Sequence, residues 1–207
     1  MDSIAVLYFL EDIAHEKFVR ALVRRVAEDS GIPSSRINEE VRNATGGKGT
    51  TLSEFSRFLR ENQGLQIHVL VVAIDANCHK YTSRLREIRR RVKNAGIGWQ
   101  VVCAIPDPHI ERWYLADPSA IPRAFQKERG LTTHLPRYKC ERGWYKQALR
   151  RAIEDVAGFV PPLGGVEYGQ DIAGAMDLYT AGRDDRALKH FIDDIKQVFT
   201  VLKESRP

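Results

Sequence analysis

The segment VLVVAIDANCHKY, residues 69–81, decides the fold class. Its first six residues are all apolar, which is typical of a parallel strand that is buried on both faces of a sheet. The apolar run ends at a carboxylate, Asp75, and Asn77 follows two positions later. Because ligands bind at the carboxyl ends of the strands in open α/β sheets, the segment predicts a polar site at that edge.

Three further segments have the character of strands. IAVLYFL (4–10) is apolar throughout and runs into Glu11 and Asp12, WQVVCAIP (99–106) is a similar run, and SRINEEVRN (35–43) is a shorter candidate. Apolar residues at helical spacing lie between the strands, and Thr51 with Glu54 has the pattern of a capping box at a helix start. This alternation predicts an α/β fold with a four-stranded, mostly parallel sheet between helices, over residues 1–106.

No strand pattern follows residue 106. The segments up to residue 207 have helical periodicity, and the last, which begins at DDRAL, carries the clearest apolar stripe. We therefore expect a helical extension, residues 107–207, that packs on the α/β core.

Length and composition indicate a globular protein of 207 residues, with 43% hydrophobic and 29% charged residues. No apolar run reaches the ~18 residues of a membrane span, and no signal peptide is evident, so the sequence predicts a cytoplasmic protein without membrane association. The odd number of cysteines, Cys78, Cys103 and Cys140, favours reduced thiols over a disulfide framework.

The basic residues are unevenly distributed. Lysine and arginine exceed the acids by 32 to 27, for a net charge of +5, and six of them lie between residues 84 and 93: Arg84, Arg86, Arg89, Arg90, Arg91 and Lys93. Such a cluster suits a phosphate-rich partner. An ordinary solvated helix face explains it equally well.

Two polar strand ends suggest a metal site. If the strands that end at Leu10 and Ile74 are neighbours, Glu11, Asp75 and Asn77 converge, and their oxygen atoms are the ligands that Mg²⁺ or Mn²⁺ takes in proteins. The alternative is that Asp12 and Asp75 only cap the helices that follow them.

The chain resembles the Toprim family in two places. LEDIAHEKF (10–18) resembles the E-G-x-x-[DE]-x-x-F opening of stand-alone Toprim-like proteins, and PDPHIERWYLADP (106–118) resembles a later segment with acids at Glu111 and Asp117. A first strand ending in Glu and a later strand ending in Asp-x-Asp are features of topoisomerases, primases and the overcoming-lysogenization-defect nucleases. Three positions depart from the pattern: Asp12 replaces Gly, His15 an acid, and Asn77 the second aspartate.

The resemblance implies a Mg²⁺- or Mn²⁺-dependent nuclease that hydrolyses phosphodiesters, with DNA a more suitable substrate than RNA. Glu11 and Asp75 would be the principal metal ligands and catalytic acids, Asn77 a weak ligand, and Glu111 a further acid or base. It also implies an ATPase partner and a role in prokaryotic anti-phage defence. The alternative is a non-catalytic Toprim-like module that binds nucleic acid, a nucleotide or a partner ATPase.

Two more segments contain candidate nucleic-acid contacts. GGKGTT (46–51) lacks the Walker pattern, but as a Gly-rich loop it could bring Lys48 to a phosphate backbone or be a plain surface loop. YKCERGWYK (138–146) interleaves aromatic residues with Lys139, Arg142 and Lys146, which suits nucleic acid or a helix that packs Trp144 inward. The cysteines and histidines lack zinc-site spacing, so no zinc site is predicted.

Overall fold

The computed structural model describes residues 3–46, 49–127 and 137–204. Its centre is a four-stranded, entirely parallel sheet in the order β2-β1-β3-β4. The strands are β1 (Ile4–Leu10), β2 (Ile37–Asn43), β3 (Val69–Ala73) and β4 (Gln100–Ala104). The predicted α/β class and the four strands are confirmed, with strand ends shifted by only a few residues.

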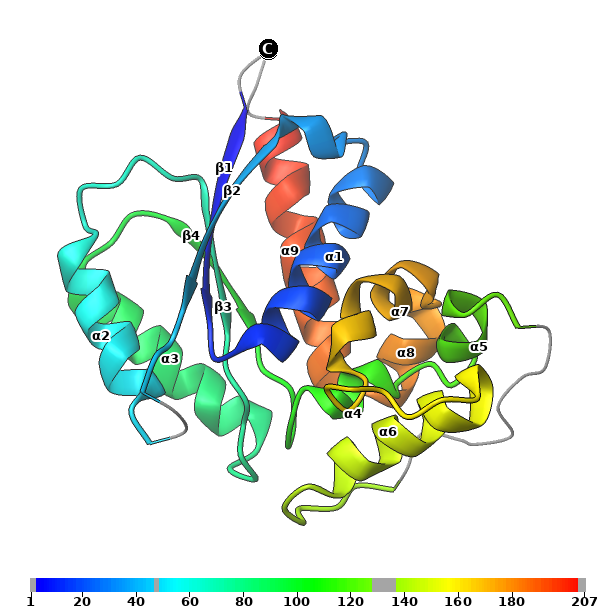
Figure 1. Cartoon of the computed structure of the whole chain (residues 1–207). Coiled ribbons are helices and arrows are strands. Elements are labelled where there is room, and N and C mark those ends of the chain that lie inside the picture. The colour runs from blue at the N-terminus through cyan, green and yellow to red at the C-terminus, as the bar shows by residue number, and fades with distance from the viewer. Residues whose placement is uncertain (1–2, 47–48, 128–136, 205–207) are drawn as a thin grey trace.

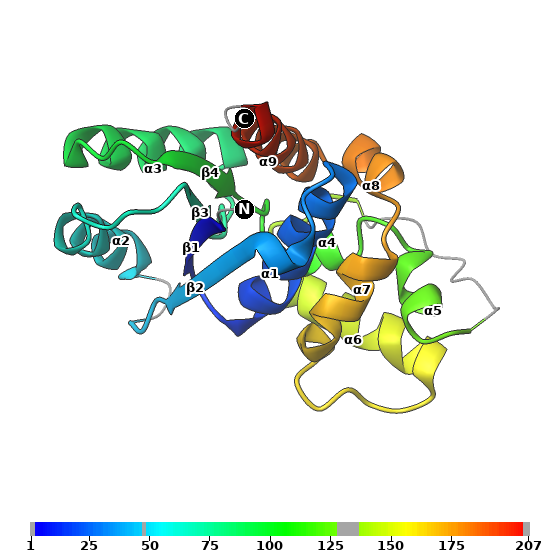
Figure 2. The ribbon, with the colours of Figure 1, turned by 90° about the horizontal axis from the view of Figure 1, so that it is seen from above.

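Helices cover both faces of the sheet (Figures 1 and 2). The helices α1 (Ile13–Asp29) and α9 (Arg186–Glu204) lie on one face, and α2 (Thr51–Glu61) and α3 (Tyr81–Ala95) lie on the other. Side chains of β3 therefore alternate between two apolar environments: Val69 and Val71 pack toward α1 and α9, while Leu70 and Val72 pack toward α2 and α3. Double burial explains why the strand sequence is continuously apolar.

The remaining helices form a group beside α1, toward the carboxyl ends of the strands (Figure 1). They are α4 (Glu111–Tyr114), α5 (Ala120–Ala124), α6 (Trp144–Ala157), α7 (Gly169–Ala175) and α8 (Leu178–Asp184), with short 3₁₀ turns at Ser34–Arg36 and Val166–Tyr168. Their apolar side chains share one hydrophobic core with α1, α9 and the sheet. The Tyr114 hydroxyl donates to the carbonyl of Ala14 at 2.9 Å, which holds α4 against the first turn of α1.

The start of α2 differs from the predicted capping box. The helix begins at Thr51, but Thr50 is the N-cap, and the Glu54 carboxylate accepts hydrogen bonds from the Thr50 hydroxyl and from the amides of Thr45 and Gly46. The cap is therefore one residue earlier than the sequence pattern indicated, because Glu54 binds the preceding loop. None of the helices in the described ranges combines the length and the apolar character that a membrane crossing requires.

Candidate functional site

Glu11 and Asp75 meet at the carboxyl edge of the sheet. Their strands β1 and β3 are neighbours, with Leu10 opposite Ala73, and the Glu11 amide donates to the carbonyl of Ala73 at 2.9 Å. The Glu11 carboxylate oxygen Oε2 accepts the backbone N–H of Asp75 at 2.8 Å. The predicted convergence of these two acids is therefore present.

His15 completes this cluster from the first turn of α1. Its side chain is fully buried, its Nε2 lies 3.1 Å from Asp75 Oδ1, and its Nδ1 lies 2.8 Å from Asp12 Oδ1. His109, which precedes α4, contacts the other oxygen of Asp75 through Nδ1 at 3.0 Å. Both oxygens of the Asp75 carboxylate are thus held by imidazole rings.

The two aspartates differ in their capping roles. Asp12 is the N-cap of α1, and its Oδ1 accepts the amides of Ala14 and His15 at 3.0 and 3.1 Å. Asp75 caps no helix: α3 begins only at Tyr81, whose amide donates to Asp107 Oδ2 at 3.0 Å. The helix-capping alternative is therefore right for Asp12 and wrong for Asp75, since the chain makes a five-residue loop before α3 starts.

The charges in the cluster are strongly coupled. Burial alone would lower the pKa of His15, but the negative charges of Asp75 and Asp12 outweigh it and raise the pKa to about 10. Burial alone would raise the pKa of Asp75, but His15 and His109 keep it below its usual value. Burial and the nearby charge of Asp75 raise the pKa of Glu11. The raised pKa of Glu11 means that the negative charge of this carboxylate is disfavoured beside Asp75, and a bound cation would stabilise it.

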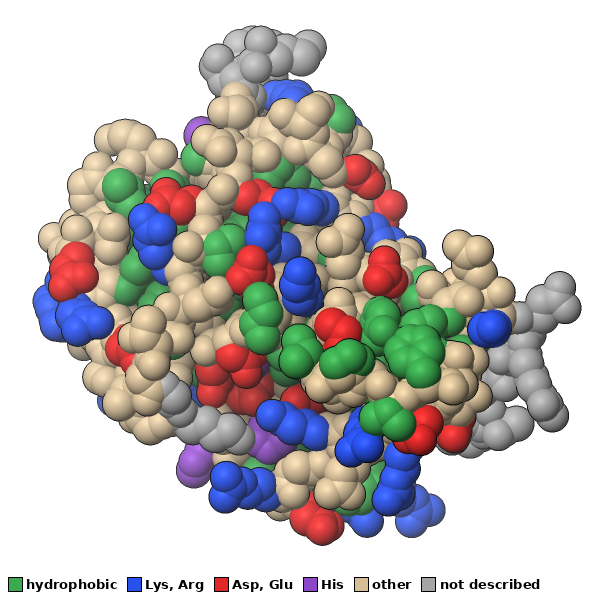
Figure 3. All heavy atoms as spheres, in the orientation of Figure 1, with side chains coloured by type: hydrophobic (Ala, Val, Ile, Leu, Met, Phe, Trp, Pro, Cys, Tyr) green, Lys and Arg blue, Asp and Glu red, His purple; other side chains and the backbone are tan. Residues whose placement is uncertain are grey.

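A cavity of about 240 Å³ opens onto these acids. Its lining includes Glu11 and Asp75 from the strand ends, His109 from the segment before α4, and Arg142 and Lys146 from the chain around the start of α6. In the orientation of Figure 1, Figure 3 shows Asp and Glu side chains gathered below the end of β1, with Lys, Arg and His side chains beside them. Carboxylates that suit a metal ion and cations that suit a phosphate therefore line the same cavity.

Glu111 also lines the cavity, at the first position of α4. It is almost fully buried, and its Oε1 lies 3.7 Å from Lys146 Nζ. Burial raises the pKa of Glu111, and the negative charge of Asp75 adds to the increase. A carboxyl group with a raised pKa beside such an acidic cluster is suited to proton transfer.

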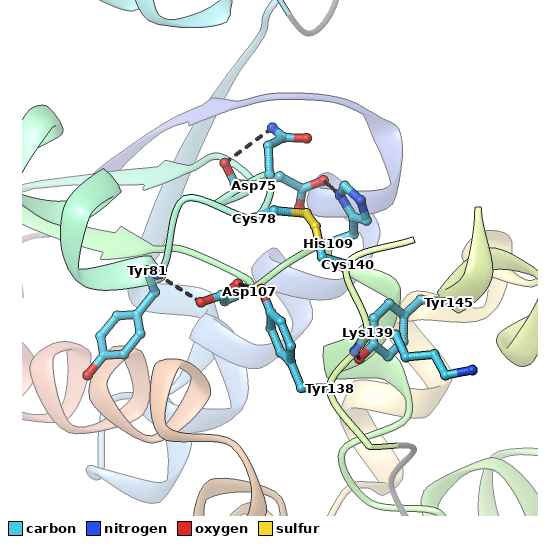
Figure 4. The surroundings of a disulfide bond; sticks show 10 residues. Asp75, Cys78, Tyr81, Asp107, His109, Tyr138, Lys139, Cys140 and Tyr145 are labelled. Atoms are coloured by element: carbon cyan, nitrogen blue, oxygen red, sulfur yellow. Dashed lines mark hydrogen bonds and ion pairs between the residues drawn. A yellow bond between two sulfur atoms is a disulfide. The ribbon is translucent and has the colours of Figure 1, made fainter. Parts of the chain in front are cut away.

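A disulfide between Cys78 and Cys140 closes one wall of this region (Figure 4). It joins the loop after β3 to the segment before α6, with the two Cα atoms 5.8 Å apart. The same segment is held by Tyr138, whose hydroxyl donates to Asp107 Oδ1 at 2.9 Å. The prediction of reduced thiols is wrong for these two residues, because the chain before α6 folds back over the strand ends; Cys103 is a free, buried thiol.

Asn77 does not join the cluster of Glu11, His15 and Asp75. Its backbone has a positive φ of 50°, and its side-chain Nδ2 donates to the carbonyl of Asp75 at 3.4 Å. Its amide N–H donates to the carbonyl of Pro108. Asn77 thus shapes the loop that follows Asp75, and the third side chain that converges with Glu11 and Asp75 is His15.

The basic residues predicted to bind nucleic acid fall into several environments. On α3, Arg84 and Arg91 form ion pairs with Glu87, and Arg89 lies 3.6 Å from Asp194 of α9. Arg90 and Lys93 on the same helix are exposed. Lys139 stacks over the Trp144 ring, with Nζ 5.0 Å from the ring centroid, and Lys48 lies outside the described residues. Of the predicted residues within the described ranges, only Arg142 and Lys146 line the cavity.

The donor set at the strand ends fits a divalent cation. Glu11, His15 and Asp75 each offer one ligand atom, and these atoms all lie within 4.8 Å of one another. The adjoining cavity leaves space for water or substrate at the remaining positions. His15 and His109 were not predicted as site residues; the available signals for His15 were its acidic position in the Toprim-like opening and its place one helical turn after Asp12, which follows the strand end.

Fold and site define an α/β protein with an acidic and imidazole cluster at the carboxyl ends of a parallel sheet. Residues 10–196 match the family described as "Domain of unknown function (DUF4276)", and the chain belongs to this family. Comparisons with curated proteins and with solved structures found no match.

Proposed function

We propose that this protein is a divalent-metal-dependent phosphodiesterase of the nuclease type, with DNA as its substrate. The observation that supports the proposal most strongly is that Glu11 and Asp75 line the same cavity as Arg142 and Lys146. Phosphodiester hydrolysis requires both kinds of group, because a cation site must lie close to contacts for the anionic ester.

The side chains divide this work. Glu11 and Asp75 would hold the ion, which when bound polarises a phosphoryl oxygen and orients water. Arg142 and Lys146 would bind the nonbridging oxygens and the flanking phosphates, as guanidinium and ammonium groups commonly do. Glu111, whose pKa is raised by burial, would exchange a proton with the attacking water or the leaving oxygen.

The resemblance to Toprim proteins supports the same reaction class. The parallel sheet with Glu11 at the end of one strand and Asp75 at the end of its neighbour is consistent with that fold. An ATPase partner and a role in anti-phage defence remain proposals that rest on this resemblance alone, and fold-level likeness by itself does not define activity.

A cleavage assay tests the proposal. Plasmid DNA, single-stranded DNA, RNA and nucleotides are incubated with the protein in Mg²⁺, in Mn²⁺ and in chelator. We expect metal-dependent cleavage of DNA that is lost in Asp75→Asn, a substitution that keeps the size of the side chain. Hydrolysis of nucleotides alone would instead define a small-molecule phosphatase, and no cleavage in any metal would contradict the proposal.

One observation favours a second candidate, a non-catalytic module that binds nucleic acid. His15 contacts one carboxylate oxygen of Asp75 and His109 contacts the other, as expected if the imidazoles are permanent counter-ions of a buried acid and no metal ion binds. In that case the protein would bind DNA with equal affinity in chelator and in Mn²⁺, and Asp75→Asn would alter stability without altering DNA binding.

A further inference from the structure

The cluster at the strand ends contains a nitrogen donor in a fixed orientation. His15 is completely buried at the start of α1, and its backbone N–H is bound by the N-cap residue Asp12. The Asp12 carboxylate also lies 2.8 Å from Nδ1 of the ring. With Nδ1–H donating to Asp12, the opposite nitrogen, Nε2, points toward Asp75 and Glu11.

This arrangement matches a recurring pattern in metalloproteins. A ligating histidine almost always donates its second ring N–H to a carboxylate, a backbone carbonyl or water, which sets the tautomer and the ring orientation. Asp12, His15 and the acids stand in that order here. The 3.1 Å between His15 Nε2 and Asp75 Oδ1 also equals the spacing of adjacent ligands, which is about 3 Å around an ion held at about 2.1 Å.

We infer that His15 is the third protein ligand of this site through Nε2, which releases its proton to solvent when the ion binds, with Asp12 as the carboxylate that orients it, and that this nitrogen makes the site select a transition-metal ion over Mg²⁺. The inference rests on the proposed function, since it assigns a ligand to the same site. Mg²⁺ takes oxygen ligands almost exclusively, whereas imidazole suits the first-row transition metals. A site with two carboxylates and one imidazole is therefore expected to bind first-row transition-metal ions more tightly than Mg²⁺.

His109 provides a matched comparison. It also contacts Asp75, but through the other oxygen, Oδ2, and it lies outside the group of three residues whose ligand atoms converge. Substitution of His109 disturbs the position of Asp75 without removing the converging nitrogen. A change that appears in His15→Gln and not in His109→Gln is therefore specific to ligation.

The test uses Mn²⁺ as the probe ion and needs no enzymatic activity. Calorimetric titration of the wild-type protein with Mn²⁺ and with Mg²⁺ gives both affinities, and pulsed electron paramagnetic resonance of the Mn²⁺ complex detects a directly bound ¹⁴N nucleus. We expect a ¹⁴N coupling in wild type and in His109→Gln, no such coupling in His15→Gln, and Mn²⁺ binding at least ~10-fold tighter than Mg²⁺ binding.

A further variant tests the role of Asp12. Asp12→Asn keeps an amino acid that is a good N-cap and removes the charge behind the ring, so α1 should form normally. We expect Mn²⁺ affinity to fall roughly 10- to 100-fold, as is usual when such an outer carboxylate is lost. Circular dichroism of each variant monitors folding, and the wild-type spectrum remains decisive if a variant does not fold.

The outcomes separate this inference from the proposed function. Mn²⁺ that binds to the wild type without a ¹⁴N coupling, or with a coupling that disappears only in His109→Gln, would overturn the assignment of His15 and leave a carboxylate site intact. Binding of Mg²⁺ as tight as that of Mn²⁺ would overturn the selectivity. If neither ion binds, both the inference and the proposed function are wrong.

Discussion

The carboxylate of Glu11 accepts the backbone N–H of Asp75 at 2.8 Å, across 64 residues of sequence. The bond joins the ends of the two central strands and places both acids beside His15. Burial and the charge of Asp75 raise the pKa of Glu11, so the contact brings together like charges that a metal ion would stabilise.

Glu11→Gln should therefore weaken metal binding without unfolding the protein. The amide oxygen can still accept the Asp75 N–H, while one negative charge is removed from a site that disfavours it. We expect Mn²⁺ affinity to fall at least ~10-fold, with the free energy of unfolding in chelator changed by less than ~1 kcal/mol. Calorimetry and urea denaturation measure the two quantities.

The matched control for this substitution is Glu61→Gln, at an exposed side chain on α2 far along the chain from the cluster. It removes the same charge and should leave Mn²⁺ affinity unchanged. An equal loss of affinity in both variants would mean that only net charge matters, in contradiction to a specific role for Glu11.

Arg142 and Lys146 should contribute to catalysis more than the basic helix α3 does. In the double variant Arg142→Ala/Lys146→Ala we expect kcat/KM for DNA cleavage to fall by about 10² or more, since both cations line the cavity. The double variant Arg90→Ala/Lys93→Ala, at exposed positions of α3, should leave kcat unchanged. It should reduce the slope of log K against log salt concentration for DNA binding by no more than roughly two phosphate contacts account for. The reverse pattern in steady-state kinetics would assign the scissile phosphate to α3.

The Cys78–Cys140 disulfide should stabilise the native state. It closes a loop with a sequence separation of 62, for which loop-closure entropy corresponds to about 4 kcal/mol. The double variant Cys78→Ser/Cys140→Ser should lose up to this amount in denaturant unfolding, and a thiol reductant should destabilise the wild type but not the variant. Equal sensitivity of both proteins to reductant would contradict the pairing.

His15 should make the stability of the metal-free protein depend on pH. Its pKa in the folded state is raised to about 10, above the value near 6.5 of an unfolded chain. Its contribution is therefore fully present below pH ~6.5 and is lost as the pH rises through about 10. The pKa of Asp12 is lowered to about 2, because the hydrogen bond and charge of His15 outweigh burial, so its contribution is lost as the pH falls through about 2.

Denaturation in chelator at several pH values measures this dependence, and His15→Gln is the control. The variant should lose the fall in stability between pH ~7 and about 10 that the wild type shows. Nuclear magnetic resonance of the His15 ring should show both nitrogens protonated at neutral pH. A neutral ring at pH 7 in the metal-free protein would contradict the coupling to Asp12 and Asp75.

The central sheet and its two acids were predictable because they depend on local patterns. Continuous apolar runs identify doubly buried strands, and the carboxyl ends of parallel neighbours meet at one edge, so Glu11 and Asp75 follow from strand boundaries alone. The position of the Asn77 side chain could not be predicted in this way, because the loop after β3 has a positive φ at that residue, which directs the side chain to the backbone. Such a turn has no reliable signal in a single sequence.

The cations that line the cavity could not be predicted, because their positions depend on tertiary packing. Arg142 and Lys146 approach the acids only because the segment before α6 crosses the strand ends, where Cys140 meets Cys78. Neither spacing nor composition indicates that crossing. The basic cluster of α3 was the stronger sequence signal, yet three of its six cations are engaged in ion pairs with Glu87 and Asp194.

The most direct measurement is anomalous X-ray diffraction from a crystal of the protein grown in Mn²⁺. We expect one strong manganese peak at the carboxyl ends of β1 and β3, within coordinating distance of Glu11, Asp75 and His15 Nε2. Well-ordered side chains in the arrangement described here, with no manganese peak between them at saturating Mn²⁺, would contradict this expectation.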